Sequence, residues 1–326
     1  MRIFILRGSY RAAPNSTVGR IKSRFWLVAP CLLTFAASET ANAESRVAVP
    51  TTEVGLDIVS DGSERIERAN LLPMLTQRVA AASCALTSGV QTDESYAALE
   101  QATQSFDAII DALKNGNPDL NINGPETNRR TLHDLENLRT AWEATHGAID
   151  AVLADGHDVD SAHLIDDQNL ELLELSNILA SDTSSQYSYP YEMTQTDVMM
   201  LNIIARQRTL SQQIAKDACE VWTGYRSDEA KEDLDKVMDI FEKSLLALRD
   251  GMPAAGLQPA PTPEIRNDLD GLIARWGPVN ANLLRQVAGE ELEHAAKEEI
   301  FHDMNLELKS LDVLVMHYQA HLERHH

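Results

Sequence analysis

Histidines spaced four residues apart near the end of the chain are the first residues whose types and spacing could support chemistry. His317, His321 and His325 lie on one face of an expected helix, and imidazole nitrogens are ligands that zinc and copper accept. Histidine near a helix C-terminus also interacts favourably with the helix dipole. We therefore favour adventitious over designed metal binding here, and we predict no cofactor.

Two Glu-x-x-His pairs precede this ladder, and each pair has the spacing of a di-iron ligand pair. They are Glu291 with His294 and Glu299 with His302. Di-iron bundles take such pairs from two different helices, whereas both pairs here fall on one expected helix. The sequence also has no haem-attachment motif, no glycine-rich phosphate loop and no nucleophile elbow. We predict that the protein is not an enzyme.

Arg208 borders a stripe of small residues on a helix expected near 193–223. On a helical wheel it lies at the edge of the apolar face, on the side that Ser211 and Ala215 widen, whereas Arg206 points into solvent. An arginine in such a place can hold an oxyanion with two parallel hydrogen bonds. It can equally lay its stem over apolar surface and pair with a carboxylate. The residues alone leave both interpretations open.

The helices that must position these residues belong to an internal sequence repeat. Shifting the chain by 135 residues places 74–84 on 209–219 and 106–118 on 241–253 without a gap. Further on, Asn-Leu-Glu-Leu at 169 is repeated at 305. Chance similarity between two helices would not hold register across these segments, so we infer a tandem repeat.

Each copy divides into four amphipathic helical segments with apolar residues recurring at three and four positions. Gly116 with Pro118, and Gly251 with Pro253, end the second segment of each copy. We predict an all-α fold of two tandem up-down-up-down four-helix bundles. The expected helices are 63–88, 92–115, 127–154 and 160–182 in the first copy, and 193–223, 227–250, 262–288 and 290–324 in the second.

The first 43 residues have the pattern of a cleaved secretory signal. Six basic residues precede an apolar run at 25–37, and Ala41-Asn42-Ala43 follows as a cleavage site. The run is shorter than the roughly 20 residues that span a bilayer, so we predict export to the periplasm and no stable membrane insertion. The expected organisation is a signal peptide at 1–43, a loose leader at 44–62, a first repeat at 63–183, a linker at 184–193 and a second repeat at 194–326.

The chain is strongly acidic, with a formal charge of −22. The signal segment holds six of the 28 basic residues and one of the 50 acidic ones, which leaves −27 on the mature chain. Nucleic acid and anionic membrane surfaces are therefore poor partners for the chain, and we predict no nucleic-acid binding. An anionic ligand would need a local basic pocket inside a repelling field.

Cys84 and Cys219 occupy the same position in equivalent helices of the two repeats. Export would place them in an oxidising compartment. A disulfide needs their Cα atoms within about 7 Å, and the alternative is two small apolar residues near a core. The sequence leaves both readings open.

The segment 201–212, LNIIARQRTLSQ, resembles the first-helix motif of the NarX/PilJ-like sensor domains, approximately INxAGRQRMLSQR. These are the periplasmic domains of nitrate and nitrite sensor kinases and of type IV pilus chemotaxis transducers. The resemblance implies that Arg208 binds a small anion, with Asn202, Ser211 and Gln212 as neighbours. In the family's nitrate sensors two such arginines meet across a symmetric interface between first helices.

The first repeat departs from that motif, because Pro73 stands where Arg208 stands in the second. A proline removes the charge and either delays or kinks the helix, so only a homodimer pairing second repeats would restore a two-arginine site. We predict an exported soluble sensory module that binds a small ligand, such as nitrate or nitrite, and signals through an unidentified partner protein. The alternative is a structural or adaptor protein that keeps the sensor fold without ligand binding.

Overall fold

The computed structural model describes residues 53–187 and 195–324, which belong to one compact unit. The predicted signal peptide, most of the linker and His325 lie outside the described residues. The helices are α1 Glu53–Thr87, α2 Thr92–Asn115, α3 Arg129–Ala154 and α4 Val159–Tyr187, then α5 Gln195–Thr223, α6 Ser227–Asp250, α7 Pro263–Val287 and α8 His294–Glu323.

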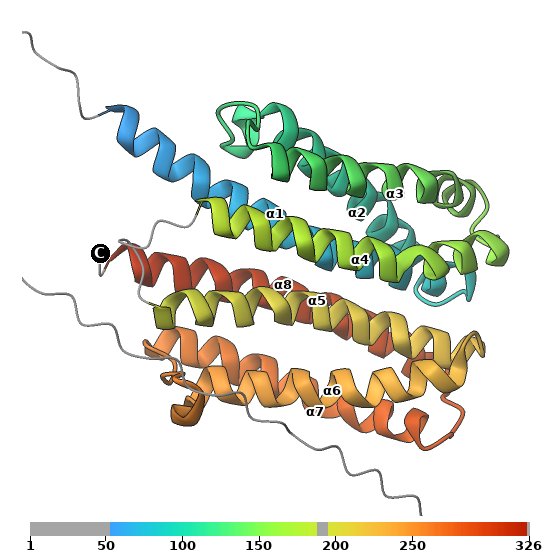
Figure 1. Ribbon diagram of the computed structural model, residues 1–326. Coiled ribbons are helices and arrows are strands. Elements are labelled where there is room, and N and C mark those ends of the chain that lie inside the picture. Colours follow the sequence, from blue (N-terminus) through green and yellow to red (C-terminus); the bar gives the residue numbers. More distant parts are fainter. Residues whose placement is uncertain (1–52, 188–194, 325–326) are drawn as a thin grey trace, which may run out of the picture. The chain divides into compact units, whose positions relative to one another are not determined.

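These helices form two bundles of four, and the described residues contain no β-strand. In the first bundle α1 packs against α2 and α4, and α3 against α4; in the second, α5 packs against α6 and α8, and α7 against α8. The all-α prediction is confirmed. The bundles meet chiefly where α1 packs against α5, and Figure 1 shows α2 and α3 on one side of this seam and α6 and α7 on the other.

The same turn closes the second helix of both repeats. Gly116 has φ 82° and Gly251 has φ 80°, and their amides donate to the carbonyls of Ala112 and Ala247. A Cβ at Gly251 would lie 2.8 Å from the backbone nitrogen of Pro259, so glycine is needed both for the left-handed backbone and for the close approach. A short 3-10 turn then begins at Pro118 or Pro253.

The first helix begins ten residues before the predicted position, so part of the predicted loose leader is helical. Its extension is held to the rest of the bundle, because Arg65 bonds both to Asp61 (2.8 Å) and to the carbonyl of Leu113 (3.1 Å). Pro73 lies inside α1 rather than delaying it. The contact between Arg65 and Leu113, which is distant along the chain, explains why the local sequence pattern placed the start of the helix too late.

Two other helix ends also differ from the predicted positions. The fourth helix continues to Tyr187, past the predicted repeat end at 183, because the Tyr187 hydroxyl donates to Glu126 (2.8 Å) in the segment before α3. The eighth helix begins at His294 rather than 290, since Gly289 takes φ 89° and Glu293 stays extended. Both helix ends are set by contacts or backbone geometry outside the apolar periodicity.

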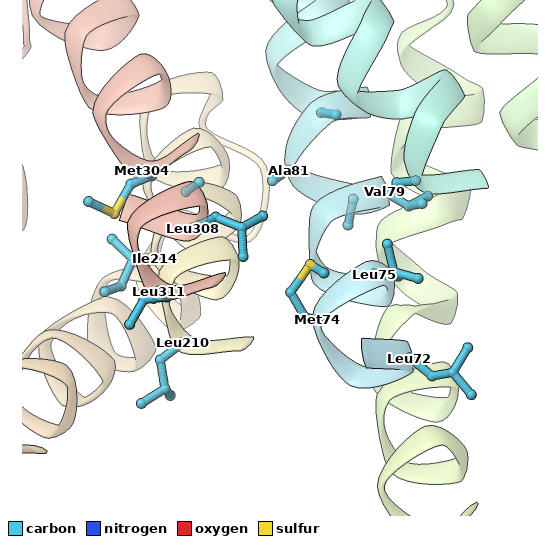
Figure 2. Close-up of a cluster of buried hydrophobic side chains, with 14 of the residues drawn as sticks. Leu72, Met74, Leu75, Val79, Ala81, Leu210, Ile214, Met304, Leu308 and Leu311 are labelled. Atoms are coloured by element: carbon cyan, nitrogen blue, oxygen red, sulfur yellow. The ribbon is translucent and has the colours of Figure 1, made fainter. Parts of the chain in front are cut away.

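The seam between the bundles has an apolar centre. Figure 2 shows Met74 and Ala81 of α1 pointing toward the second bundle and Leu308 of α8 pointing back, whereas Leu75 and Val79 of α1 point into their own bundle. All five side chains are buried. The first helix of the first repeat therefore has two apolar faces, which explains why α1 is so rich in alanine and leucine.

Candidate functional site

A disulfide ties the two first helices together at one end of the seam. Cys84 and Cys219 are joined with an S–S distance of 2.01 Å and a Cα–Cα distance of 6.2 Å. The sequence separation of 135 equals the repeat shift, so equivalent positions of the two repeats face each other. The structure thus brings together the two residues whose pairing the sequence left open.

Arg208 lies in the seam between carboxylates of two other helices. Its Nη1 donates to Glu67 Oε1 of α1 (2.8 Å), and its Nε lies 2.9 Å from Asp312 Oδ1 of α8. Arg208 is only 3% exposed. Burial raises the pKa of Asp312, and Arg208 opposes that rise. The arginine is therefore engaged by two anionic side chains of the chain itself.

The three residues predicted to accompany Arg208 do not converge on one space around it. Ser211 is buried and donates to the carbonyl of Arg208 in its own helix (2.8 Å). Gln212 is buried and donates to the carbonyl of Met304 (3.3 Å). Asn202 is exposed. Of the four predicted residues, Arg208, Ser211 and Gln212 are buried and Asn202 is not.

Arg78 is a seam residue that the sequence analysis missed. Its Nη1 donates to Gln212 Oε1 (3.2 Å) and to Asn305 Oδ1 (2.7 Å) of the second bundle. In the first bundle the equivalent pair, Gln77 and Asn169, bond directly to each other (2.8 Å). Burial lowers the pKa of Arg78. The replacement of Arg78 by Gln213 in the second repeat was the signal that could have revealed it.

A second charged cluster, which we call the junction cluster, lies beside the disulfide. It consists of Asp166 of α4 with Lys216, Asp217 and Glu220 of α5. The Lys216 ammonium lies 2.9 Å from Asp217 Oδ1 and 3.6 Å from Asp166 Oδ1, and it donates to Glu220. Asp166 is 8% exposed and Glu220 is 5% exposed, so carboxylates from both repeats meet in a nearly dry place.

The junction cluster retains a proton in the neutral range. Burial and, after it, a hydrogen bond with Asp166 raise the pKa of Glu220 to about 8, although Lys216 opposes the rise. Burial also raises the pKa of Asp217, against the pull of Lys216. The pKa of Lys216 itself is raised despite burial, because the three carboxylates surround it. A protonated Glu220 can donate one hydrogen bond to Asp166, which leaves the other Asp166 oxygen without a donor.

A cavity of about 480 Å³ opens next to this cluster. Asp166 and Glu220 both line it, together with Cys84 of the disulfide. One wall is aromatic: the rings of His163 and Tyr225 stack with centroids 3.6 Å apart. The remaining lining residues are Thr87, Ser88, Val90, Val159, Ala162, Trp222, Thr223, Gly224, His294 and Lys297. Each repeat supplies part of the wall.

The histidine ladder does not assemble into a metal centre among the described residues. His317 Nδ1 lies 2.6 Å from Asp268 Oδ2 of α7, and this carboxylate raises the pKa of His317. In the described part of the chain, no group of three or more His, Cys, Asp or Glu side chains is placed to hold a metal ion. The described helices also include none long and apolar enough to cross a membrane.

Two bundles of one design, joined through their first helices beside a cavity that both of them line, define a tandem helical-repeat protein. The family model described as type IV pili methyl-accepting chemotaxis transducer N-term, PilJ, matches residues 59–167 and 195–300. The chain belongs to this family, and the two matched segments correspond to the two repeats. A search of curated proteins gives no match.

Proposed function

We propose that the chain is an exported sensory module that binds a small ligand and acts through a partner protein. The family described for the chain is that of a chemotaxis transducer's N-terminal region, a type of domain that receives a signal and passes it on. One observation carries the ligand-binding part of this proposal: the cavity of about 480 Å³ is lined by residues of both family units. A ligand there would contact both units at once.

Export is supported by two independent features. The N-terminal 43 residues have the composition of a secretory signal, and the Cys84–Cys219 disulfide requires an oxidising compartment to persist. We therefore propose the periplasm as the place of action. The test compares two fusions to a reporter that is active only in the periplasm, one of the full chain and one of the chain without residues 1–43. We expect reporter activity only from the fusion that keeps residues 1–43.

Anion binding at Arg208 stays a prediction, and the geometry around Arg208 requires that an anion compete with carboxylates of the chain. An incoming nitrate or nitrite would have to displace Glu67 or Asp312, which already pair with the guanidinium. The structural or adaptor alternative draws its support from the same two pairs, because they give Arg208 a role in holding the bundles together.

A thermal-shift screen of the oxidised chain separates sensing from a purely structural role. A ligand that binds only the folded state must raise the melting temperature, by an amount that grows with its concentration. The screen includes nitrate, nitrite, amino acids and small amines. We expect at least one compound to raise the melting temperature; if none of a broad panel does, the adaptor alternative is favoured.

A further inference from the structure

We infer that the cavity between the two repeats binds a small molecule through an ammonium group, which Asp166 and Glu220 hold. This inference rests on the proposed sensing function and names the chemical class of its ligand. The site lies beside the disulfide, whereas the family resemblance pointed to Arg208, so the two places are tested by different variants.

The first argument is the state of the two carboxylates. Asp166 and Glu220 are each more than nine-tenths buried, yet both line the cavity. Within the described residues, neither carboxylate oxygen of Asp166 accepts a hydrogen bond from a nitrogen donor. Its nearest cations, Lys216 and Arg226, stay 3.6 Å away. Buried carboxylate oxygens ordinarily find donors, and an ammonium group with three N–H bonds supplies them.

The second argument is the charge balance around the cavity. The ionisable groups that face the site are Asp166 and His163 from α4, Lys216, Asp217 and Glu220 from α5, Arg226 from the following turn, Asp233 from α6, and His294 and Lys297 from α8. Three buried carboxylates face one buried lysine, and Arg226 is half exposed. Protonation of Glu220 offsets the excess negative charge in the free protein, and a bound ammonium would take over that role.

The third argument is the character of the walls and of the whole chain. The aromatic rings of Trp222 and Tyr225 line the cavity, and aromatic faces attract organic cations. The indole nitrogen of Trp222 is buried and has no hydrogen-bond acceptor among the described residues. His294 and Lys297 suit a carboxylate at the far end of a zwitterion. The net charge of the chain attracts cations and repels anions.

The fourth argument is that the first repeat does not contain this cluster. Under the repeat shift, Lys216, Asp217 and Glu220 correspond to Ala81, Ala82 and Ala85. Alanine is sufficient for helix packing at these places, as the first repeat shows by burying all three. Helix packing therefore does not require the charged residues of the second repeat. They lie where the cavity opens, so we assign them to ligand binding.

Calorimetric titration of the oxidised full chain tests the inference with four probes of similar length. Butylamine carries one positive charge, putrescine carries two, γ-aminobutyrate is a zwitterion and butyrate is an anion. We expect the ammonium compounds to bind and butyrate not to bind. Tighter binding of putrescine would identify a diamine site, and tighter binding of γ-aminobutyrate would identify an amino-acid site that uses Lys297.

Two variants and a matched control assign the binding to the site. Asp166→Asn and Glu220→Gln each weaken amine binding by about tenfold or more, because each removes a charged hydrogen-bond acceptor. Glu171→Gln, an exposed position of the same helix, makes the same charge change and leaves binding unaltered. Circular dichroism and thermal unfolding of each variant establish that it is folded.

Proton release gives a second readout that needs no variant. At about pH 7, amine binding expels the proton from Glu220, so the measured heat depends on the ionisation enthalpy of the buffer. The inference is wrong if no ammonium probe binds, if butyrate binds as well as butylamine does, or if folded Asp166→Asn binds amines as the wild type does. If no amine binds but another compound raises the melting temperature, the proposed ligand class is wrong and the proposed sensing function is retained.

Discussion

Single residues distinguish the two halves of this molecule more than its helices do. Pro73 replaces Arg208, Gln213 replaces Arg78, and Ala85 replaces Glu220 under the repeat shift. Each of these differences lies in or beside the seam where the bundles meet. The sequence identified Arg208 through its place on a helical wheel, but it did not identify Glu67 or Asp312 as its partners, because those residues come from other helices.

Removing Arg208 should destabilise the protein. Arg208→Ala removes a buried arginine and leaves the partly exposed Glu67 and Asp312 without their cation, and we expect a loss of about 1–3 kcal/mol in the free energy of unfolding. Denaturant unfolding measures it. Arg206→Ala, an exposed arginine of the same helix, is the control and should change little. Equal effects of the two substitutions would contradict the structural role of Arg208.

If Arg208 also binds nitrate, calorimetry should show heat with the wild type and none with Arg208→Ala. Glu67→Gln should then strengthen nitrate binding, because it removes a competing anion without removing the arginine. Absence of heat with the intact protein would end the nitrate hypothesis.

Glu220 should make the stability of the protein depend on pH. Its pKa is raised to about 8 in the folded state, whereas an unfolded glutamate titrates near 4.3. The unfolded chain therefore releases this proton first, so the contribution is fully present below about pH 4 and is lost as pH rises toward 8. We expect Glu220→Gln to remove roughly 1–3 kcal/mol of the decline in unfolding free energy between about pH 5 and pH 8. Superimposable pH profiles for the two proteins would contradict the raised pKa.

At the scale of the element, the apolar periodicity predicted the helices and their number. It predicted helix ends only where glycine and proline mark them in the sequence. The second helix of each repeat ends at the position predicted from Gly116 and Gly251. The start of α1 and the end of α4 could not be predicted, because Arg65 and Tyr187 reach partners far away in the sequence. The junction cluster could not be predicted either, since a pattern along α5 does not reveal that Asp166 of α4 lies opposite.

Two glycine substitutions should have opposite effects on stability. Gly251→Ala brings a Cβ to 2.8 Å from the backbone of Pro259 at φ 80°, and we expect it to cost about 1–3 kcal/mol. Gly271→Ala lies within α7, where a Cβ meets nothing within 4 Å, and we expect a gain of about 0.5–1 kcal/mol from helix propensity. Thermal unfolding compares them. A neutral or stabilising effect of Gly251→Ala would show that the turn after α6 does not require glycine.

At the scale of the whole molecule, two compact bundles are fastened by a covalent bond between their first helices. The disulfide closes a segment of 135 residues, which includes most of the first bundle and the beginning of the second. Chain-entropy arguments assign a few kcal/mol to a closure of this length.

The double variant Cys84→Ser with Cys219→Ser should unfold at lower denaturant concentration, by about 2–5 kcal/mol in the free energy of unfolding. Its helix content before unfolding should match that of the wild type, because the two substitutions leave the shared apolar core of the helices intact. Adding a reductant should lower the stability of the wild type and leave the double variant unchanged. A reductant effect on both proteins would show that the disulfide is not its target.

In a symmetric dimer, every substitution is present in both subunits. Because this chain carries its two family units in one polypeptide, a substitution can change one unit alone. Each chain therefore has a single place where Asp166 faces Glu220. In the second repeat the position of Asp166 is taken by His302, which contacts Glu94 instead (2.9 Å). Occupancy should consequently follow a simple hyperbola, with one ligand per polypeptide and a Hill coefficient of about one. If the proposed site binds its ligand in this way, the response would rise gradually with concentration, without the threshold that paired identical sites can produce.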